Sequence, residues 1–203
     1  MLRKLFKEQY LMILPIIAYG DPVLKRKADE IEKDYPNLQK LIKDMFKTMY
    51  KANGVGLAAP QIGKSIRLFI VDASPFSEGE EGDPSCDGFI RVYINPVIYE
   101  ETGKEWGMEE GCLSIPNIRE EVYRKPNVKI EYFDENWELY EEELTGFPAR
   151  VVQHEYDHIE GTLFTDKISS QRKTLLQSKL NDISKGEVEA NYKMKFPKLN
   201  RRK

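Results

Sequence analysis

The sequence predicts an α+β fold with three helices and several short antiparallel strands. Apolar residues repeat at helical spacing after residue 36, polar and apolar residues alternate in segments between residues 66 and 144, and helical signals return after residue 146. The 203 residues are 40% hydrophobic, which is enough for a core. We therefore expect a single domain in which helices and small sheets share that core.

The first helix is expected to begin at Pro36 and to end at Gly54, because proline favours the first helical turn and glycine follows the last. Between them, apolar residues recur every three or four positions: Leu38, Leu41, Ile42, Met45, Phe46, Met49 and Tyr50. This spacing places them on one face of a helix. We expect that face to pack in the core rather than to bind a cofactor.

Strands are indicated where polar and apolar residues alternate and β-branched or aromatic residues are frequent. Residues 66–72 and 91–99 are predicted to pair as antiparallel strands, and residues 127–134 and 138–144 are predicted to form a hairpin. Residues 13–19 are interpreted as an early extended segment.

The two cysteines differ in their surroundings. Residues 74–88 contain proline, glycine, serine and five acids, so we expect a mobile surface loop that holds Cys86. No motif surrounds Cys86, and we assign it no role. Two cysteines are too few for a disulfide framework and are typical of a protein of the reducing cytoplasm.

Charge and hydropathy narrow the range of partners. A net charge of −3 does not favour a protein that coats nucleic acid, and no stretch approaches the roughly 20 apolar residues of a membrane span. Residues 169–203 nevertheless hold ten Lys or Arg against three acids. We expect residues 186–203 to form a mobile basic tail, which is either simply solvated or in contact with an anionic partner such as RNA.

The chain contains only two histidines, His154 and His158, and Glu155 lies between them in an H-E-x-x-H array. The segment is predicted to be a helix that starts at Gly146 to Pro148 and stops at Gly161. A four-residue separation then places both imidazoles on one face, with Glu155 about 100° around the helix from His154. Surface or capping histidines are the alternative, but a whole histidine supply at chelating distance favours a metal site with a carboxylate as proton acceptor.

A catalytic site of this kind uses three protein ligands and one open position. Cys112 is the candidate third ligand, because Gly111 leaves room for a close approach and a thiolate binds a divalent ion well. The alternative is a small buried cysteine without chemistry. Two nitrogens and one sulfur suit zinc, iron, cobalt or nickel.

Residues 54–63 are dense in small residues, which allow the backbone to come close to a ligand or to another segment. Gln61 is the polar group that this loop offers to a substrate. A tight loop with a surface glutamine is the alternative.

Three segments together resemble the peptide deformylase family: residues 54–61 (GVGLAAPQ), 110–114 (EGCLS) and 153–158 (QHEYDH). The resemblance extends over nearly the whole chain after residue 12. It implies a fold in which the metal-binding helix is packed among small antiparallel sheets. It also implies removal of the N-formyl group from the N-terminal methionine of newly synthesised polypeptides, with release of formate.

The resemblance implies domain boundaries and partners as well. Met12 resembles a natural initiator, so residues 1–11 are expected to be an extension before a single catalytic domain of residues 12–185. The substrate would be a formyl-methionyl nascent peptide. The ribosome is then a candidate partner for the basic C-terminal end, and no membrane partner is expected.

The resemblance assigns Cys112, His154 and His158 to one divalent ion, Fe²⁺ in the cell and Zn²⁺, Ni²⁺ or Co²⁺ in purified protein. Glu155 would take a proton from a water molecule at the metal and return it to the departing amine. The Gln61 side chain and the Leu113 backbone N–H would stabilise the oxyanion.

The substrate-binding residues implied by the family are Gly54, Val55, Gly56, Met108, Phe147 and Val151. The apolar side chains of this set, Val55, Met108, Phe147 and Val151, suit a thioether. Arg119 matches a position that supports the site in relatives. Arg150 stands where some relatives carry an apolar residue, so the outer wall of the pocket is a departure from the pattern.

Two alternatives to a deformylase are a zinc endopeptidase and a non-catalytic module stabilised by metal. Residues 154–161 spell H-E-x-x-H-x-x-G, but the third histidine of the metzincin pattern would fall at Phe164. A metal-stabilised module predicts four ligands, and the sequence offers three convincing donors.

Overall fold

The computed structural model describes residues 11–77 and 82–197. The chain forms an α+β fold, as predicted, with three α-helices and three small sheets among these residues. The helices are α1 (Leu38–Lys51), α2 (Gly146–Ile159) and α3 (Ser170–Lys185). The largest sheet has the strand order β2 (Gly56–Ala58), β3 (Leu68–Asp72), β4 (Ile90–Thr102), β7 (Asn127–Phe133) and β8 (Leu139–Leu144).

The two smaller sheets have two strands each. β5 (Trp106–Cys112) and β6 (Ile115–Arg124) form an antiparallel hairpin, and β1 (Ile16–Ile17) pairs in parallel with β9 (Met194–Lys195). All neighbours in the large sheet are antiparallel. The predicted pairing of the strands near residues 70 and 94, and the predicted hairpin of β7 with β8, are therefore confirmed.

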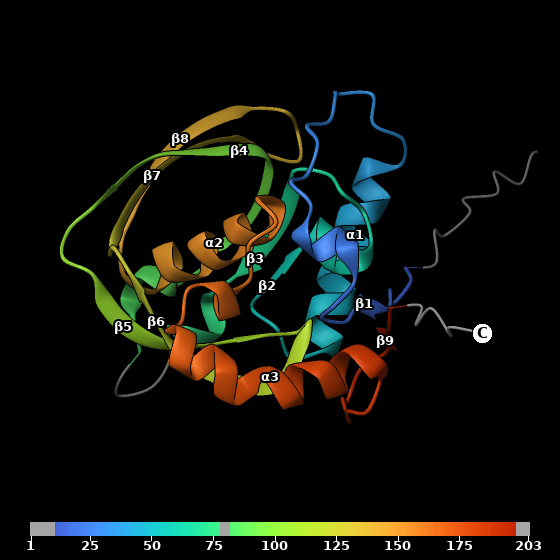
Figure 1. Cartoon of the computed structure of the whole chain (residues 1–203). Helices are drawn as coiled ribbons and strands as arrows, with labels where there is room; N and C mark the ends of the chain where they lie inside the picture. Colours follow the sequence, from blue (N-terminus) through green and yellow to red (C-terminus); the bar gives the residue numbers. More distant parts are fainter. Residues whose placement is uncertain (1–10, 78–81, 198–203) are drawn as a thin grey trace, which may run out of the picture.

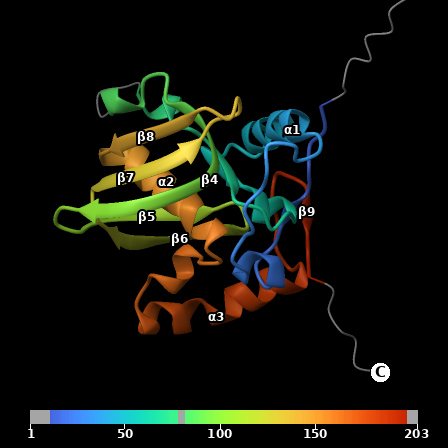
Figure 2. The same cartoon turned by 90° about the horizontal axis from the view of Figure 1, so that it is seen from above.

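Helix α2 occupies the centre of the molecule. Figure 1 shows it inside the curve of β4, β7 and β8, with the β5–β6 hairpin on its other side. Viewed from above, α3 lies beyond that hairpin (Figure 2). The helix that carries both histidines is thus enclosed by sheets, as the predicted fold class requires.

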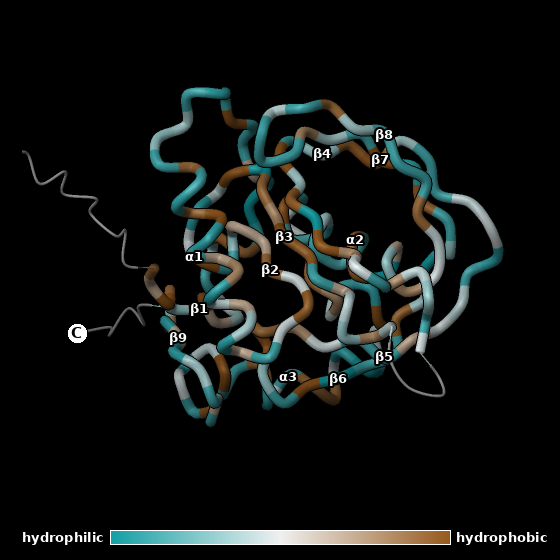
Figure 3. The backbone as a smooth tube through the Cα atoms, turned by 180° about the vertical axis from the view of Figure 1, so that it is seen from behind, coloured by the Kyte–Doolittle hydropathy of each residue, from teal (hydrophilic) through white to brown (hydrophobic). Residues whose placement is uncertain are grey.

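Strand β3 divides the core into two parts, because successive side chains of a strand point to opposite faces. Phe69 and Val71 pack with the apolar residues of α2, whereas Leu68 and Ile70 pack with those of α1. All five residues of β3 are buried, and hydrophobic residues gather around β2 and β3 in Figure 3. The two helices therefore lie on opposite faces of one sheet.

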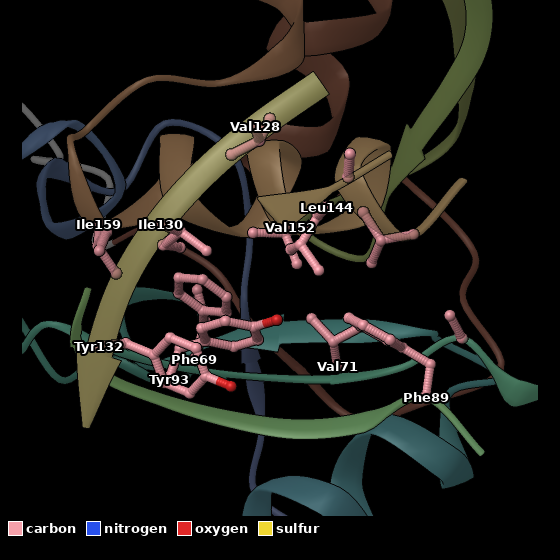
Figure 4. Packing of buried hydrophobic residues seen from close by; sticks show 14 of the residues in the cluster. Phe69, Val71, Phe89, Tyr93, Val128, Ile130, Tyr132, Leu144, Val152 and Ile159 are labelled. Atoms are coloured by element: carbon pink, nitrogen blue, oxygen red, sulfur yellow. The ribbon is translucent and has the colours of Figure 1, made fainter. Parts of the chain in front are cut away.

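Aromatic rings fill the space between the sheet and α2. Tyr93 stacks on Phe69 with ring centroids 4.6 Å apart, and its centroid lies 4.3 Å from that of Tyr132. Val152 and Ile159 of α2 belong to the same buried cluster (Figure 4). Buried aromatic pairs of this kind add about 0.5–1.5 kcal/mol each beyond their area burial. They fix α2, and with it the histidines, against a rigid surface.

Helix α1 has the predicted apolar face with two differences. It begins at Leu38 rather than Pro36, because Asn37 adopts a left-handed conformation with φ of 58°. Tyr50 is 48% exposed and is not a core residue, since its hydroxyl donates a hydrogen bond to Asp72 Oδ2 at 2.7 Å. A tyrosine at the edge of a helix face can pack its apolar ring against neighbouring side chains while its hydroxyl stays near water.

The structure corrects the expectation that Cys86 lies in a surface loop. Cys86 is 0% exposed and packs in the core cluster that also contains Phe89. A short 3₁₀ turn, Pro84–Cys86, is capped by the Asp83 side chain and directs the sulfur inward. Burial raises the pKa of the Cys86 thiol to about 11, with the charge of Asp83 as a second cause. Residues 78–81 of the same loop lie outside the described residues.

Residues 187–197 also differ from the expected solvated tail. Gly186 ends α3 in a left-handed conformation, after which the chain returns and β9 pairs with β1. Val188, Met194 and Phe196 pack against the cluster formed by α3 and the β5–β6 hairpin. Apolar residues spaced through this charged segment bring it onto the body of the protein. Residues 198–203 and the first ten residues of the expected extension lie outside the described residues.

None of the helices among the described residues is long and apolar enough to cross a membrane.

Candidate active site

Helix α2 presents both histidines toward the β5–β6 hairpin. Its four-residue spacing places the rings of His154 and His158 with centroids 5.1 Å apart. His158 is 1% exposed, and α2 ends one residue later at Ile159. Gly161, with φ of 73°, then lets the chain pass closely over the backbone of Lys25. The sequence thus predicts the helix, and the fold buries the histidine face of it.

Cys112 ends β5, where the ladder with β6 shifts register between Gly111 and Cys112. The shift brings Cys112 Sγ to 3.2 Å from His158 Nε2. One ligand atom from each of Cys112, His154 and His158 lies within 4.8 Å of the others. A tetrahedral ion with ordinary Zn–N and Zn–S bond lengths separates its nitrogen and sulfur ligands by about 3.5 Å. The three donors therefore fit one metal ion.

Glu110 orients the first histidine. His154 Nδ1 lies 2.9 Å from Glu110 Oε2, which leaves Nε2 as the nitrogen that faces the ion. Arg124 holds the same carboxylate with two hydrogen bonds of 2.7 and 2.9 Å, and Arg150 adds one of 3.1 Å. Burial opposes the charge of Glu110, but Arg124 and His154 outweigh it and hold the pKa of that carboxyl well below its usual range. The site therefore contains a fixed negative charge behind the ligands.

The pKa values of the two imidazoles are shifted in opposite directions. Burial, followed by the nearby His154, lowers the pKa of His158 well below its usual value. Burial also opposes the charged form of His154, but the Cys112 and Glu110 side chains outweigh it and raise the pKa of His154 well above its usual value. A neutral His158 has a lone pair with which it can bind a metal ion. The anionic groups around His154 stabilise a positive charge next to that ring, and a divalent ion would supply such a charge.

Glu155 lies beside the glycine-rich segment rather than among the ligands. It is 4% exposed, and its Oε2 atom has no hydrogen-bond partner among the described residues. A Cβ atom at position 56 would lie 2.7 Å from both Cδ and Cγ of Glu155 and closer still to Oε1, so only Gly56 leaves room for the carboxylate. Burial raises the pKa of Glu155 to about 7, although His154 acts in the opposite direction. A carboxyl with that pKa can accept and release a proton near neutrality.

Gln61 and Leu113 face each other across the metal ligands. The Ala58 N–H donates to Gln61 Oε1 at 2.8 Å, which directs Nε2 toward Cys112 Sγ and Ser114 Oγ, both 3.4 Å away. Among the described residues, the Leu113 N–H donates no hydrogen bond. The Leu113 N–H is thus free for a ligand, and Gln61 Nε2, which makes two hydrogen bonds of 3.4 Å, lies next to the metal ligand Cys112.

A cavity of ≈ 790 Å³ opens over these groups. Of the site residues predicted from the sequence, eleven line it: Gly54, Val55, Gly56, Gln61, Met108, Cys112, Leu113, Phe147, Val151, His154 and Glu155. His158 is the exception, because it lies buried behind the cavity wall. The Phe147 ring packs on Phe76 at 4.2 Å between centroids.

Arg150 is a buried residue that connects backbone segments around the site. Its guanidinium is buried, donates to the Val122 and Trp106 carbonyls at 3.0 and 2.8 Å, and lies 4.5 Å from the centroid of the Trp106 ring. Arg119 also lines the cavity, with an exposed side chain. An arginine is tolerated at position 150 because Glu110 and two carbonyls accept hydrogen bonds from its two terminal nitrogens, while Nε is buried without a partner among the described residues.

Sequence reasoning missed two parts of the site. Glu110 belongs to the second motif, but the sequence assigned no role to its side chain. The available signal was its position two residues before Cys112 on a strand, because residues i and i+2 point to the same face. Residues 189–192 also line the cavity, although they follow the last predicted helix. The available signal was the alternation of polar and apolar residues in residues 187–196, which is typical of an extended segment that is buried on one side.

Comparisons with known proteins agree with this geometry. The family model described as polypeptide deformylase matches residues 13–174. Peptide deformylase from Christiangramia forsetii is 59% identical over 190 residues, covering 92% of this chain and 97% of that protein, and the Flavobacterium psychrophilum protein of the same name is 54% identical, covering 91% and 97%.

Solved structures give the same result. A peptide deformylase from Legionella pneumophila has a TM-score of 0.74 and 36% identity, covering 87% of this chain and 98% of that one. Peptide Deformylase from Thermotoga maritima has a TM-score of 0.68 and 42% identity, covering 78% and 99%. The endopeptidase alternative finds no support in these likenesses. The chain belongs to the peptide deformylase family, a family of metalloenzymes, and its activity is the removal of the N-formyl group from newly synthesised polypeptides.

Proposed function

We propose that Cys112, His154 and His158 hold one divalent ion, and that this ion is Fe²⁺ in the cell, with Zn²⁺, Ni²⁺ or Co²⁺ replacing it in purified protein. The observation that supports the proposal is the convergence of three donors within 4.8 Å of one another. Among the described residues no fourth His, Cys, Asp or Glu joins this group, as expected of a catalytic site with an open position rather than a closed structural site. Two nitrogens and one thiolate are compatible with all four metals, so availability decides.

A divalent ion held by Cys112, His154 and His158 would supply Lewis-acid chemistry, which polarises a carbonyl and lowers the pKa of a water molecule from 15.7 toward roughly 7. Glu155 accepts a proton from that water as its oxygen bonds to the formyl carbon. Its carboxyl, with a pKa raised to about 7, then returns the proton to the nitrogen as the carbon–nitrogen bond breaks. Formate and a free N-terminal amine are the products.

Gln61 Nε2 and the Leu113 N–H stabilise the negative charge that develops on the formyl oxygen. The orientation of Gln61 supports this role, because the Ala58 N–H holds the other end of its amide. The Leu113 N–H is available for the same role, because it has no partner among the described residues. Donors that are already oriented need no reorganisation during the reaction. Removing one such donor typically costs about 100- to 1000-fold in rate.

The methionine side chain binds against Val55, Met108, Phe147 and Val151. These residues line one cavity, and Met108 adds an adaptable thioether surface. Gly54 and Gly56 line the same cavity without a side chain, which allows the substrate backbone close to the site. The pocket accordingly selects an unbranched apolar side chain next to the formyl group.

The cytoplasm is the proposed location, and the ribosome is the proposed partner of the basic C-terminal end. The four cationic residues at positions 198 and 201–203 follow the described residues and support a contact with anionic RNA. Cosedimentation with ribosomes at low salt tests this proposal. Replacement of these four residues by serine should weaken binding, and unchanged binding would end the proposal.

The substrate assignment is tested by comparing formyl-Met-Ala-Ser with acetyl-Met-Ala-Ser and with a longer peptide that has internal bonds. The protein should release formate from the first peptide, leave the acetyl group in place and cleave no internal bond. Purification without oxygen, followed by metal analysis, tests the choice of Fe²⁺. Zinc as the dominant metal in protein purified this way would contradict that choice.

A further inference from the structure

Residues 187–197 run alongside the active-site cavity and are fastened at several points. The Asn117 side chain donates to the Glu189 carbonyl at 2.9 Å, β9 pairs with β1, and Phe196 packs over Gly186. Between these anchors, residues 189–192 form part of the cavity wall. The family match ends at residue 174, so this wall is built by residues beyond the matched region.

Tyr192 makes a specific contact from this wall. Its hydroxyl donates a hydrogen bond of 2.8 Å to the carbonyl of Leu113, across 79 positions of the sequence. Leu113 and Ser114 are the two residues of the turn between β5 and β6, and Leu113 directly follows the ligand Cys112. Tyr192 therefore contacts the backbone of the residue whose N–H is free beside the metal ligands.

The two carbonyl groups of this turn accept hydrogen bonds from residues outside the hairpin. The Ser114 carbonyl accepts a hydrogen bond of 2.9 Å from the Tyr19 N–H, and the Leu113 carbonyl accepts the one from Tyr192. Both carbonyls of a two-residue turn are thus held from outside the hairpin. The Leu113 carbonyl belongs to the peptide unit after Leu113 and the Leu113 N–H to the unit before it, so fixing the carbonyl restrains the N–H through the two backbone dihedrals of Leu113.

We propose that Tyr192 is a positioning residue for deformylation, whose hydroxyl holds the Leu113 carbonyl so that the Leu113 N–H stays in place to stabilise the formyl oxyanion. This inference rests on the proposed role of the Leu113 N–H. Tyr192 does not touch the reacting atoms in this arrangement. It acts through the backbone, because a preorganised donor is effective only while its direction is fixed.

The test is Tyr192→Phe, which removes one oxygen atom and keeps the ring. Tyr123→Phe is the matched control, since Tyr123 is an exposed residue on β6 of the same hairpin and its hydroxyl bonds only to the Glu121 side chain. The readouts are kcat and KM for formyl-Met-Ala-Ser per mole of bound metal, metal content and Tm. We expect kcat of Tyr192→Phe to fall by roughly 5- to 20-fold, part of the loss of a whole donor. KM should stay within about twofold and metal content should be unchanged, while Tyr123→Phe should match the wild type.

Three results would overturn the inference. A lower Tm with unchanged kcat would make the contact purely structural, a higher KM with unchanged kcat would make Tyr192 a substrate contact, and a loss of metal would assign it to ion binding. Gln61→Ala separates this inference from the function on which it rests. If Gln61→Ala is nearly inactive and Tyr192→Phe is not impaired, only the role of Tyr192 fails. If Gln61→Ala retains full kcat, the oxyanion arrangement itself fails.

Discussion

Gly56→Ala is expected to disable the enzyme without touching a metal ligand. The added Cβ would lie 2.7 Å from Cδ and Cγ of Glu155, whereas carbon atoms in contact are about 3.5–4.0 Å apart. One of the two must therefore move by about 1 Å. The backbones of α2 and β2 are packed in the core, so the strain is relieved by moving the Glu155 carboxylate into the cavity that it lines and away from its position beside the ligands. A displacement of about 1 Å in a catalytic group can cost about 100-fold in rate.

The assay is formate release with metal content and Tm measured on the same preparation. We expect kcat to fall about 100-fold, which corresponds to about 2.7 kcal/mol of activation free energy. Metal content should remain at the wild-type level because Gly56 contacts none of the three ligands. Overpacking should lower the unfolding free energy by about 1–3 kcal/mol.

Gly107→Ala provides the matched control. A Cβ there would also meet a carboxylate, at 2.6 Å from Glu121 Oε1, but Glu121 is exposed and can swing into solvent. Its rate should stay within about twofold of the wild type. A Gly56→Ala protein with near-normal kcat would refute the reasoning, since it would show that Glu155 tolerates displacement or has no role as proton carrier.

Three further predictions concern charged groups. Glu110→Gln should weaken metal affinity by about 10- to 100-fold, measured by competition with a chelating dye, because the residue orients His154; unchanged affinity would contradict this. Glu155→Gln should lower kcat by about 100- to 10,000-fold with full metal content, and a near-normal rate would remove Glu155 from the mechanism. Burial opposes the charge of Asp166, but Lys173 and Lys25 lower its pKa to about 2, so its stabilising effect should be complete above pH ~4 and disappear as the pH falls to ~2. The Tm difference between wild type and Asp166→Asn should therefore close across that window, and a constant difference would refute the linkage.

The elements that the sequence predicts are those with a strong internal period. Polar and apolar residues alternate along β7, so the pattern sets which of its side chains face the core, whereas β3 is buried throughout and is indicated by its β-branched and aromatic residues. The apolar stripe of α1 works in the same way, except at Tyr50, where the edge of the face meets solvent.

The site is only partly readable from sequence for a different reason. The spacing of His154 and His158 is a local property of a helix, whereas the contact of Cys112 with them depends on a register shift in a distant hairpin. The two cysteines illustrate the difference between motif and burial. Cys86 is fully buried without a site, and Cys112 is partly exposed at one.

Contacts formed by isolated residues were beyond prediction. Glu110 meets His154 and two arginines that are far apart in the sequence, and Tyr192 contacts Leu113 from a segment 79 positions later in the chain. Residues 187–197 carry several charges, so composition alone indicates a solvated segment despite the apolar residues that anchor it. Only the folded chain shows that those anchors share a surface with α3.

The central claim is that a sulfur from the β5–β6 hairpin and two imidazoles from α2 hold one catalytic ion. Metal content and formate release, measured side by side on the wild type, Cys112→Ala and Cys86→Ala, test it most directly. The wild type and Cys86→Ala should each contain about one metal per chain and release formate at similar rates at 25 °C, while Cys112→Ala loses both properties. A Cys112→Ala protein that retained metal and activity would contradict the account.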